Sequence, residues 1–124
     1  MPAKDLNIRL KRAYDPPSPE DGVRVLVDRL WPRGVAKSEA AIDRWLKEVA
    51  PSSELRRWFG HDPRKWNEFR RKYQVELWGR GDLLKELRLA AQKGPLTLVY
   101  SARDQEHNQA VVLRDVLKGA PPDE

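Results

Sequence analysis

The segment that most constrains the fold runs from Val23 to Gly34, with the sequence VRVLVDRLWPRG. Its first half alternates valine with other residues, and this density of β-branched side chains favours a pleated, half-buried strand. Pro32 cannot donate a hydrogen bond to a strand ladder, and Gly34 permits positive φ. We therefore expect a strand that stops near Leu30 and continues as an exposed polar turn.

Cationic side chains lie in or beside this segment, at Arg24, Arg29, Arg33 and Lys37. A guanidinium group is costly to bury without a partner. The arginines therefore either form internal ion pairs, for which Asp28 is the nearest acid, or face a ligand at the end of the strand.

Strand patterns alternate with helix patterns along the chain. Residues 6–12 alternate apolar and polar side chains, and residues 96–100 form the near-continuous apolar run of an interior strand. Predicted N-caps stand at Ser52, Asp62, Asp82 and Asp104, and predicted helix ends at Gly60, Gly79, Gly94 and Gly119. This order implies an α/β fold: a single small layered domain over residues 1–124, with a mostly parallel or mixed short sheet flanked by helices.

Three stretches have weaker patterns. Residues 42–49 fit a short amphipathic helix, with an irregular extended segment as the alternative. Residues 13–22 contain three prolines and are predicted to form a loop, and residues 119–124 a short C-terminal tail.

Composition excludes several classes of protein. The 124 residues include no cysteine, so there is no disulfide framework, thiolate nucleophile or cysteine metal site. No apolar run is long enough to span a membrane, and the first residues lack the apolar core of a signal peptide. We expect a cytoplasmic protein without membrane association, and its net charge of +5 suits an anionic partner without requiring one.

The first candidate site combines Arg29, Trp31, Arg33 and Lys37. An indole ring beside guanidinium groups can stack on a planar ligand while the cations hold a phosphate or carboxylate. The alternative is structural: Asp28 pairs with Arg29 or Arg24, and Trp31 fills the core.

The second candidate site follows the apolar strand at residues 96–100. A strand that turns directly into a helix places free backbone N–H groups at its end, where an anion can bind. Ser101, Arg103, His107 and Asn108 would add side-chain donors. The turn lacks the glycine pattern of a phosphate-binding loop or a dinucleotide fingerprint, so we expect no cofactor.

The two histidines, His61 and His107, are the candidates for proton transfer, since histidine titrates near neutral pH. A metal site would need both histidines and additional carboxylates, so none is predicted. In the alternative, His107 lies on the surface, and the segment at His61 begins a helix that Asp62 caps.

A run of basic residues from Arg56 to Lys72 is the third candidate surface. Beside aromatic residues, it would suit a nucleic-acid backbone. Glu54, Glu68 and Glu76 are interspersed and can neutralise much of it through pairs three or four residues apart.

Several motifs together resemble the YeaO-like bacterial proteins, a family of small domains of unknown function. The matching segments are VLVDRLWPRG (25–34), WLK (45–47), APS (50–52), LRRWFGHDP (55–63), TLVYSARD (97–104) and HN (107–108). The resemblance covers nearly the whole chain and implies a compact cytoplasmic α/β domain, without implying a reaction.

The function predicted from the residues is binding of a small anionic ligand, phosphate-bearing and nucleotide-like, at the strand ends. The protein would act there either as a binding protein or as an enzyme. The alternatives are a nucleic-acid-binding accessory protein that uses the basic run, and a protein-interaction module. The oligomeric state stays open, although an exposed Trp45 or Trp78 would favour a dimer interface.

Overall fold

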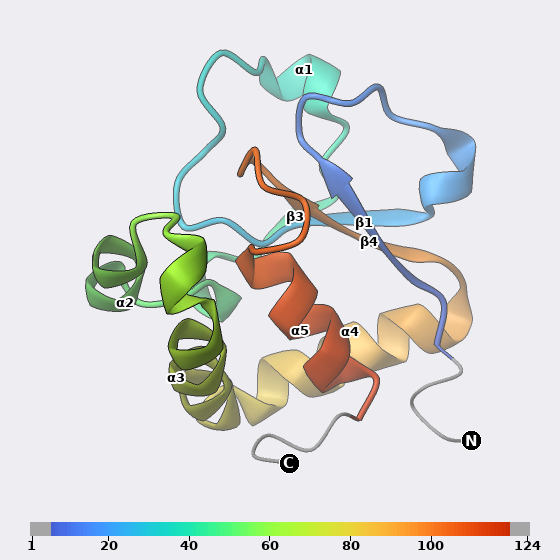
Figure 1. Ribbon diagram of the computed structural model, residues 1–124. Helices are drawn as coiled ribbons and strands as arrows, with labels where there is room; N and C mark the ends of the chain where they lie inside the picture. The colour runs from blue at the N-terminus through green and yellow to red at the C-terminus, as the bar shows by residue number, and fades with distance from the viewer. Residues whose placement is uncertain (1–5, 120–124) are drawn as a thin grey trace.

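The computed structural model describes residues 6–119, and at its centre lies a four-stranded parallel sheet (Figure 1). In sheet order the strands are β1 (Ile8–Arg12), β4 (Leu96–Tyr100), β2 (Val23–Leu26) and β3 (Arg44–Trp45). The predicted α/β class is confirmed, and every strand pair is parallel. β4 pairs with a strand on each side and is buried along its whole length, as its apolar sequence predicts.

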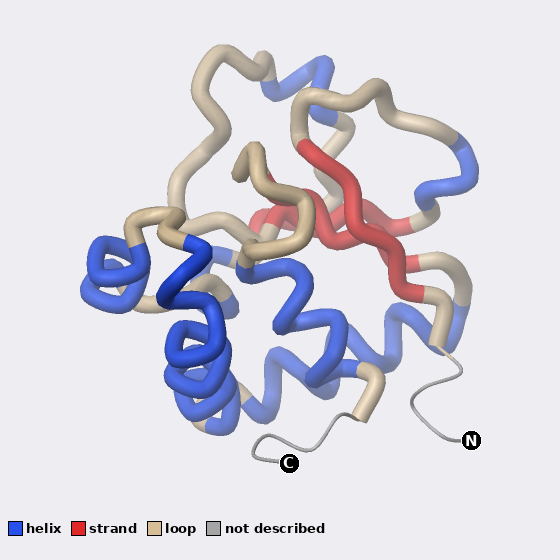
Figure 2. The backbone as a smooth tube through the Cα atoms, in the orientation of Figure 1, coloured by secondary structure: helices blue, strands red, loops and turns tan. Residues whose placement is uncertain are grey.

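The helices gather mainly on one side of the sheet (Figure 2). They are α1 (Lys37–Ala40), α2 (Ser53–Phe59), α3 (Trp66–Trp78), α4 (Gly81–Lys93) and α5 (Gln109–Leu117). α5 contacts β1 and β4, α4 contacts β4, and α3 packs against α5. Short 3-10 helices occupy Pro19–Asp21, Lys47–Val49 and Pro63–Lys65.

The sheet buries both of its faces, because successive side chains of a strand point to opposite sides. Val25 and Leu98 belong to the main core, together with residues of α2 to α5. Leu26 and Val99, the next residues along each strand, belong to a smaller cluster on the opposite face. The remaining members of that smaller cluster are Ala13, Trp31, Ile42 and Trp45.

The caps predicted at Ser52, Gly60 and Asp62, in the middle of the chain, are confirmed. The Ser52 hydroxyl accepts a hydrogen bond from the Leu55 N–H, and Gly60 ends α2 in the left-handed conformation. The Asp62 carboxylate accepts from the Arg64 N–H at the start of the 3-10 turn that leads into α3.

Two predicted caps are wrong. α4 begins at Gly81, so Asp82 lies in its first turn, where its charge suits the helix dipole. The Asp104 carboxylate accepts hydrogen bonds from the N–H groups of Glu106 and His107 and thereby closes a turn ahead of the helix. Asn108 caps α5 instead, four residues later.

Two predicted boundaries also change. β2 ends at Leu26 instead of near Leu30, because the chain leaves the sheet after the Val27 N–H donates to the Val99 carbonyl. Residues 42–49 are not an amphipathic helix. They form β3 and a 3-10 turn, since pairing with β2 satisfies their backbone groups and lets Trp45 cover the smaller cluster.

The segment 13–22 contains the 3-10 turn Pro19–Asp21, whose Asp21 carboxylate is buried against Arg24 and Lys11. Residues 120–124 of the predicted tail lie outside the described residues. Within residues 6–119, none of the helices has the length and apolar character that crossing a membrane would require.

Candidate functional site

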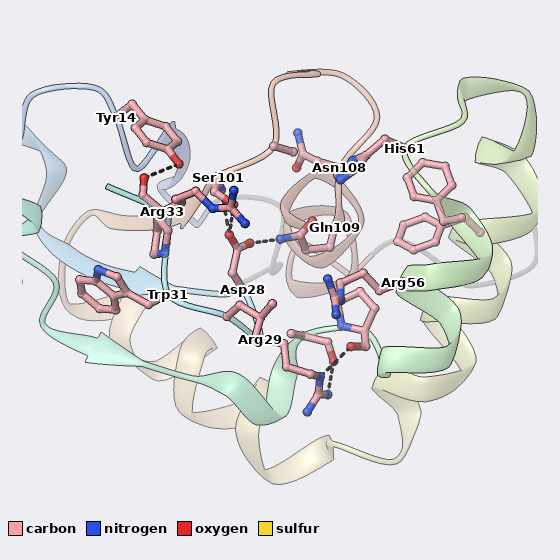
Figure 3. A pocket seen from close by; sticks show the side chains of 17 residues that line it. Tyr14, Asp28, Arg29, Trp31, Arg33, Arg56, His61, Ser101, Asn108 and Gln109 are labelled. Atoms are coloured by element: carbon pink, nitrogen blue, oxygen red, sulfur yellow. Dashed lines mark hydrogen bonds between the residues drawn. The ribbon is translucent and has the colours of Figure 1, made fainter. Parts of the chain in front are cut away.

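A pocket of about 290 Å³ lies at the carboxyl ends of β2 and β4 (Figure 3). Ligands of open parallel sheets commonly bind at this edge. Its polar lining comes from the segments after β2 and β4, from the start of α5, from α2 and its C-terminal turn, and from Tyr14. The polar lining residues are Tyr14, Asp28, Arg29, Arg33, Arg56, His61, Ser101, Asn108 and Gln109.

Asp28 lines the pocket and joins the segments after β2 and β4 to the start of α5. One carboxylate oxygen, Oδ2, accepts hydrogen bonds from the Ser101 N–H at 2.9 Å and the Ser101 hydroxyl at 2.5 Å. The other oxygen, Oδ1, accepts from the Gln109 side-chain amide. Burial raises the pKa of Asp28, while the hydrogen bonds from Ser101 and Gln109 and the charge of His61 oppose that shift. Asp28 is the sole acidic residue among the described residues that line the pocket.

The loop between β4 and α5 brings Asn108 to the pocket. The Asn108 side chain is buried, accepts a hydrogen bond from the Val111 N–H and donates one to the Asp104 carbonyl. It therefore caps α5 and holds the loop at the same time. Because the helix begins only at Gln109, this loop is longer than the tight turn that the sequence suggested.

The three lining arginines differ in how they are held. Arg29 donates to the carbonyls of Pro51 (3.1 Å) and Ala50 (3.2 Å), so part of its guanidinium is committed to the fold. Among the described residues, neither the Arg33 nor the Arg56 side chain has a hydrogen-bond or ion-pair partner. Figure 3 shows Arg33 and Arg56 on opposite sides of the pocket, with Asp28 and Gln109 between them.

The two histidines occupy different environments. His61 follows Gly60 in the left-handed backbone conformation, and its side chain lines the pocket. The His107 ring contacts Asp104 through Nδ1 at 2.9 Å and packs edge-on against Trp66, outside the lining. Hydrogen bonds from the Glu106 and His107 backbone and from the His107 ring outweigh burial and lower the pKa of Asp104.

The structure thus brings together most of the residues predicted from the sequence. The pocket contains Arg29, Trp31, Arg33, His61, Ser101 and Asn108. Lys37, Arg103 and His107 lie outside its lining. The Lys37 amine lies 6.0 Å from the centre of the Trp31 ring, and the Trp31 indole donates to the Val35 carbonyl at 2.7 Å.

Sequence reasoning missed four polar or charged contributors. Asp28 pairs with Ser101 and Gln109 instead of with an arginine, and Arg24 pairs with Asp21. The available signal for Asp28 was its position directly after a buried strand. Arg56, Gln109 and Tyr14 carry no comparable signal, because only tertiary packing brings them to the strand ends.

The basic run on α2 and α3 is partly neutralised. Arg64 pairs with Asp62 at 3.2 Å and Lys72 with Glu68 at 3.3 Å. The Lys65 amine donates to the Trp58 carbonyl. The two ion pairs reduce the charge available to a polyanion on this surface, and the Lys65 bond ties its amine to the fold.

Comparison with known proteins classifies the chain. A family model described as the inactive DUF488-N3 subclade matches residues 7–123. The chain belongs to this family. As a DUF488-N3 protein it is 47% identical to the uncharacterized protein YeaO of Escherichia coli K12 over 113 residues, which cover 91% of this chain and 98% of the relative.

The resemblance to YeaO-like proteins is therefore confirmed. Mycobacterial relatives of the DUF488-N3 chain include the uncharacterized proteins Rv3073c of Mycobacterium tuberculosis H37Rv and Mb3100c of Mycobacterium bovis. Each is 40% identical over 116 residues, which cover 94% of this chain and 98% of the relative. No solved structure gives a significant match.

Proposed function

We propose that the pocket at the ends of β2 and β4 binds a small anionic ligand, phosphate-bearing and nucleotide-like. The observation that carries the proposal is that Arg33 and Arg56 reach one pocket with no carboxylate partner among the described residues. A guanidinium presents a fork of donors that matches phosphate or carboxylate oxygens. With Arg29 and His61 nearby and Asp28 as the opposing charge, the lining favours an anion.

The apolar part of the pocket suits a planar group. Phe59 and Phe69 both line it, and their rings stack with centroids 4.2 Å apart. A volume of about 290 Å³ is at the small end of the range typical of ligand pockets. This size favours a mononucleotide or a sugar phosphate over a dinucleotide.

The proposal is binding, with catalysis as the less favoured alternative. Of the two histidines considered for proton transfer, His61 alone lines the pocket, while His107 is engaged with Asp104. The family model's description as an inactive subclade supports a binding role. In this role His61 is a further hydrogen-bonding contact for the ligand.

Calorimetric titration with adenosine 5′-monophosphate tests the proposal. We expect Arg33→Ala and Arg56→Ala each to raise the dissociation constant by about 10- to 100-fold, since a hydrogen bond to a charged group contributes about 1.5–3 kcal/mol. The matched control is Arg70→Ala, an exposed arginine outside the pocket, and it should leave binding unchanged.

The same titration separates this site from the basic surface. A short single-stranded oligonucleotide that bound more tightly than the nucleotide, lost affinity steeply with salt and was weakened by Arg70→Ala would favour nucleic-acid binding. Absence of binding by the nucleotide, by ribose 5-phosphate and by inorganic phosphate would overturn the proposal.

A further inference from the structure

The Asp28 carboxylate, which lines the pocket, is only partly filled as a hydrogen-bond acceptor. An ionised carboxylate offers about four acceptor sites, two on each oxygen. In Asp28, Oδ2 accepts both bonds from Ser101, whereas Oδ1 accepts a single bond, from Gln109. One site on Oδ1 therefore has no partner among the described residues, although Asp28 is only 8% exposed.

The charges around Asp28 restrict what can fill that site. Arg29, Arg33 and Arg56 line the same pocket. An ammonium group brought to Asp28 would be repelled by these cations, whereas a neutral hydroxyl could donate to the carboxylate without that cost. Among the described residues, the donors to Asp28 are Ser101 and Gln109.

From this we infer that the ligand is a phosphate ester with a free sugar hydroxyl, which donates to Asp28 while the phosphate is held by Arg33 and Arg56. The inference rests on the proposed anion site and adds the part of the ligand that would provide specificity. A hydroxyl that donates to this largely buried carboxylate adds a charge-assisted hydrogen bond, so the site favours the hydroxylated ligand over an analogue that lacks the hydroxyl.

A matched ligand pair tests the inference on the unaltered protein. Adenosine 5′-monophosphate and 2′,3′-dideoxyadenosine 5′-monophosphate carry the same phosphate and base and differ in the two ribose hydroxyls. We expect the dideoxy compound to bind about 10-fold or more weakly, as loss of a hydrogen bond to a charged group implies. Equal affinity for the two nucleotides would overturn the hydroxyl inference while leaving the anion site in place.

Variants then assign the discrimination to Asp28. Asp28→Asn should reduce the preference for the hydroxylated nucleotide to less than about 3-fold, because a neutral amide oxygen is the weaker acceptor. Asp82→Asn is the matched control: Asp82 is exposed and outside the pocket lining, and its substitution should retain the preference. Circular dichroism shows whether each variant is folded.

The possible outcomes distinguish the two proposals. If both nucleotides bind equally and Arg33→Ala weakens both, the anion site stands and the hydroxyl inference fails. If neither nucleotide nor inorganic phosphate binds, the proposed function fails and the inference with it. Should Asp28→Asn not fold, tighter binding of phosphoethanolamine than of glycerol 3-phosphate to the unaltered protein would still overturn the choice of a neutral donor.

Discussion

The Nε atom of Arg29 lies 3.1 Å from the carbonyl oxygen of Pro51 and donates a hydrogen bond to it. A second bond from the same guanidinium reaches the Ala50 carbonyl. Because both carbonyls precede α2, Arg29 ties the segment after β2 to the segment that carries Arg56 into the pocket. Arg29 thus supports one wall of the site as well as lining it.

Replacing Arg29 with alanine should therefore destabilise the protein. We expect Arg29→Ala to lower the free energy of unfolding by about 1–3 kcal/mol, because two partly buried carbonyls lose their donor. Urea denaturation followed by tryptophan fluorescence measures the change. Arg33→Ala is the matched control and should stay within about 0.5 kcal/mol of the unaltered protein. A larger loss at Arg33 than at Arg29 would contradict this division of roles.

Removal of the Asp21 carboxylate should be among the more costly single changes. Asp21 and Arg24 form an ion pair of 2.6 Å in which both side chains are almost fully buried. Asp21→Ala leaves the Arg24 guanidinium buried without its charge partner, at a cost of about 3–5 kcal/mol. Chemical denaturation measures it, with the exposed neighbour in Glu20→Ala as the control. A loss below about 1 kcal/mol would show that Arg24 is held by backbone carbonyls alone.

The Asp21 carboxylate should also make the stability of the protein depend on pH. Burial acts to raise the pKa of Asp21, but hydrogen bonds from Lys11, Ser18 and Arg24 outweigh it and leave the pKa below its ordinary value of 3.8. The unfolded chain thus binds the proton more tightly, so the stabilisation is full above the ordinary pKa and is lost as pH falls through the folded pKa. Denaturation from pH 6 downward should show a steeper acid loss for the unaltered protein than for Asp21→Asn. Parallel pH profiles would refute the assignment.

Alanine substitutions at Gly22 and Gly81 test the close approach of the backbone at Gly22 to the backbone at Pro95. Gly22 has a φ of +64°, and a Cβ there would overlap the Pro95 carbonyl, which accepts a hydrogen bond from the Val23 N–H. Gly22→Ala should cost at least about 2 kcal/mol through strain and overlap. Gly81→Ala is the control, because its Cβ would meet open space at the start of α4, and it should raise stability by up to about 1 kcal/mol. Thermal unfolding compares the two, and equal effects would contradict the argument.

Local chemistry was enough to predict much of this fold. Ser52 with Gly60, and Asp62 with Pro63, mark helix boundaries because the cap and the groups it satisfies lie within one turn of chain. The apolar run of β4 marks an interior strand, since a segment without polar alternation must be covered on both faces. The arginines after β2 indicated a site at the strand ends for the same local reason: cations at the end of a buried strand need a partner.

Tertiary structure alone decided how the site is assembled. Asp28 and Ser101 are 73 residues apart, and Asp28 and Gln109 are 81 apart, so neither contact follows from local pattern. The sequence assigns Arg56 to a basic helix surface, and only the tertiary structure shows that it lines the pocket. The sequence by itself determined most of the elements, the caps at Ser52 and Asp62 and the supply of cations, because these depend on neighbours along the chain. Which cations stay unpaired, and which carboxylate faces them, depends on the packing of β2, β4 and α2 against one another.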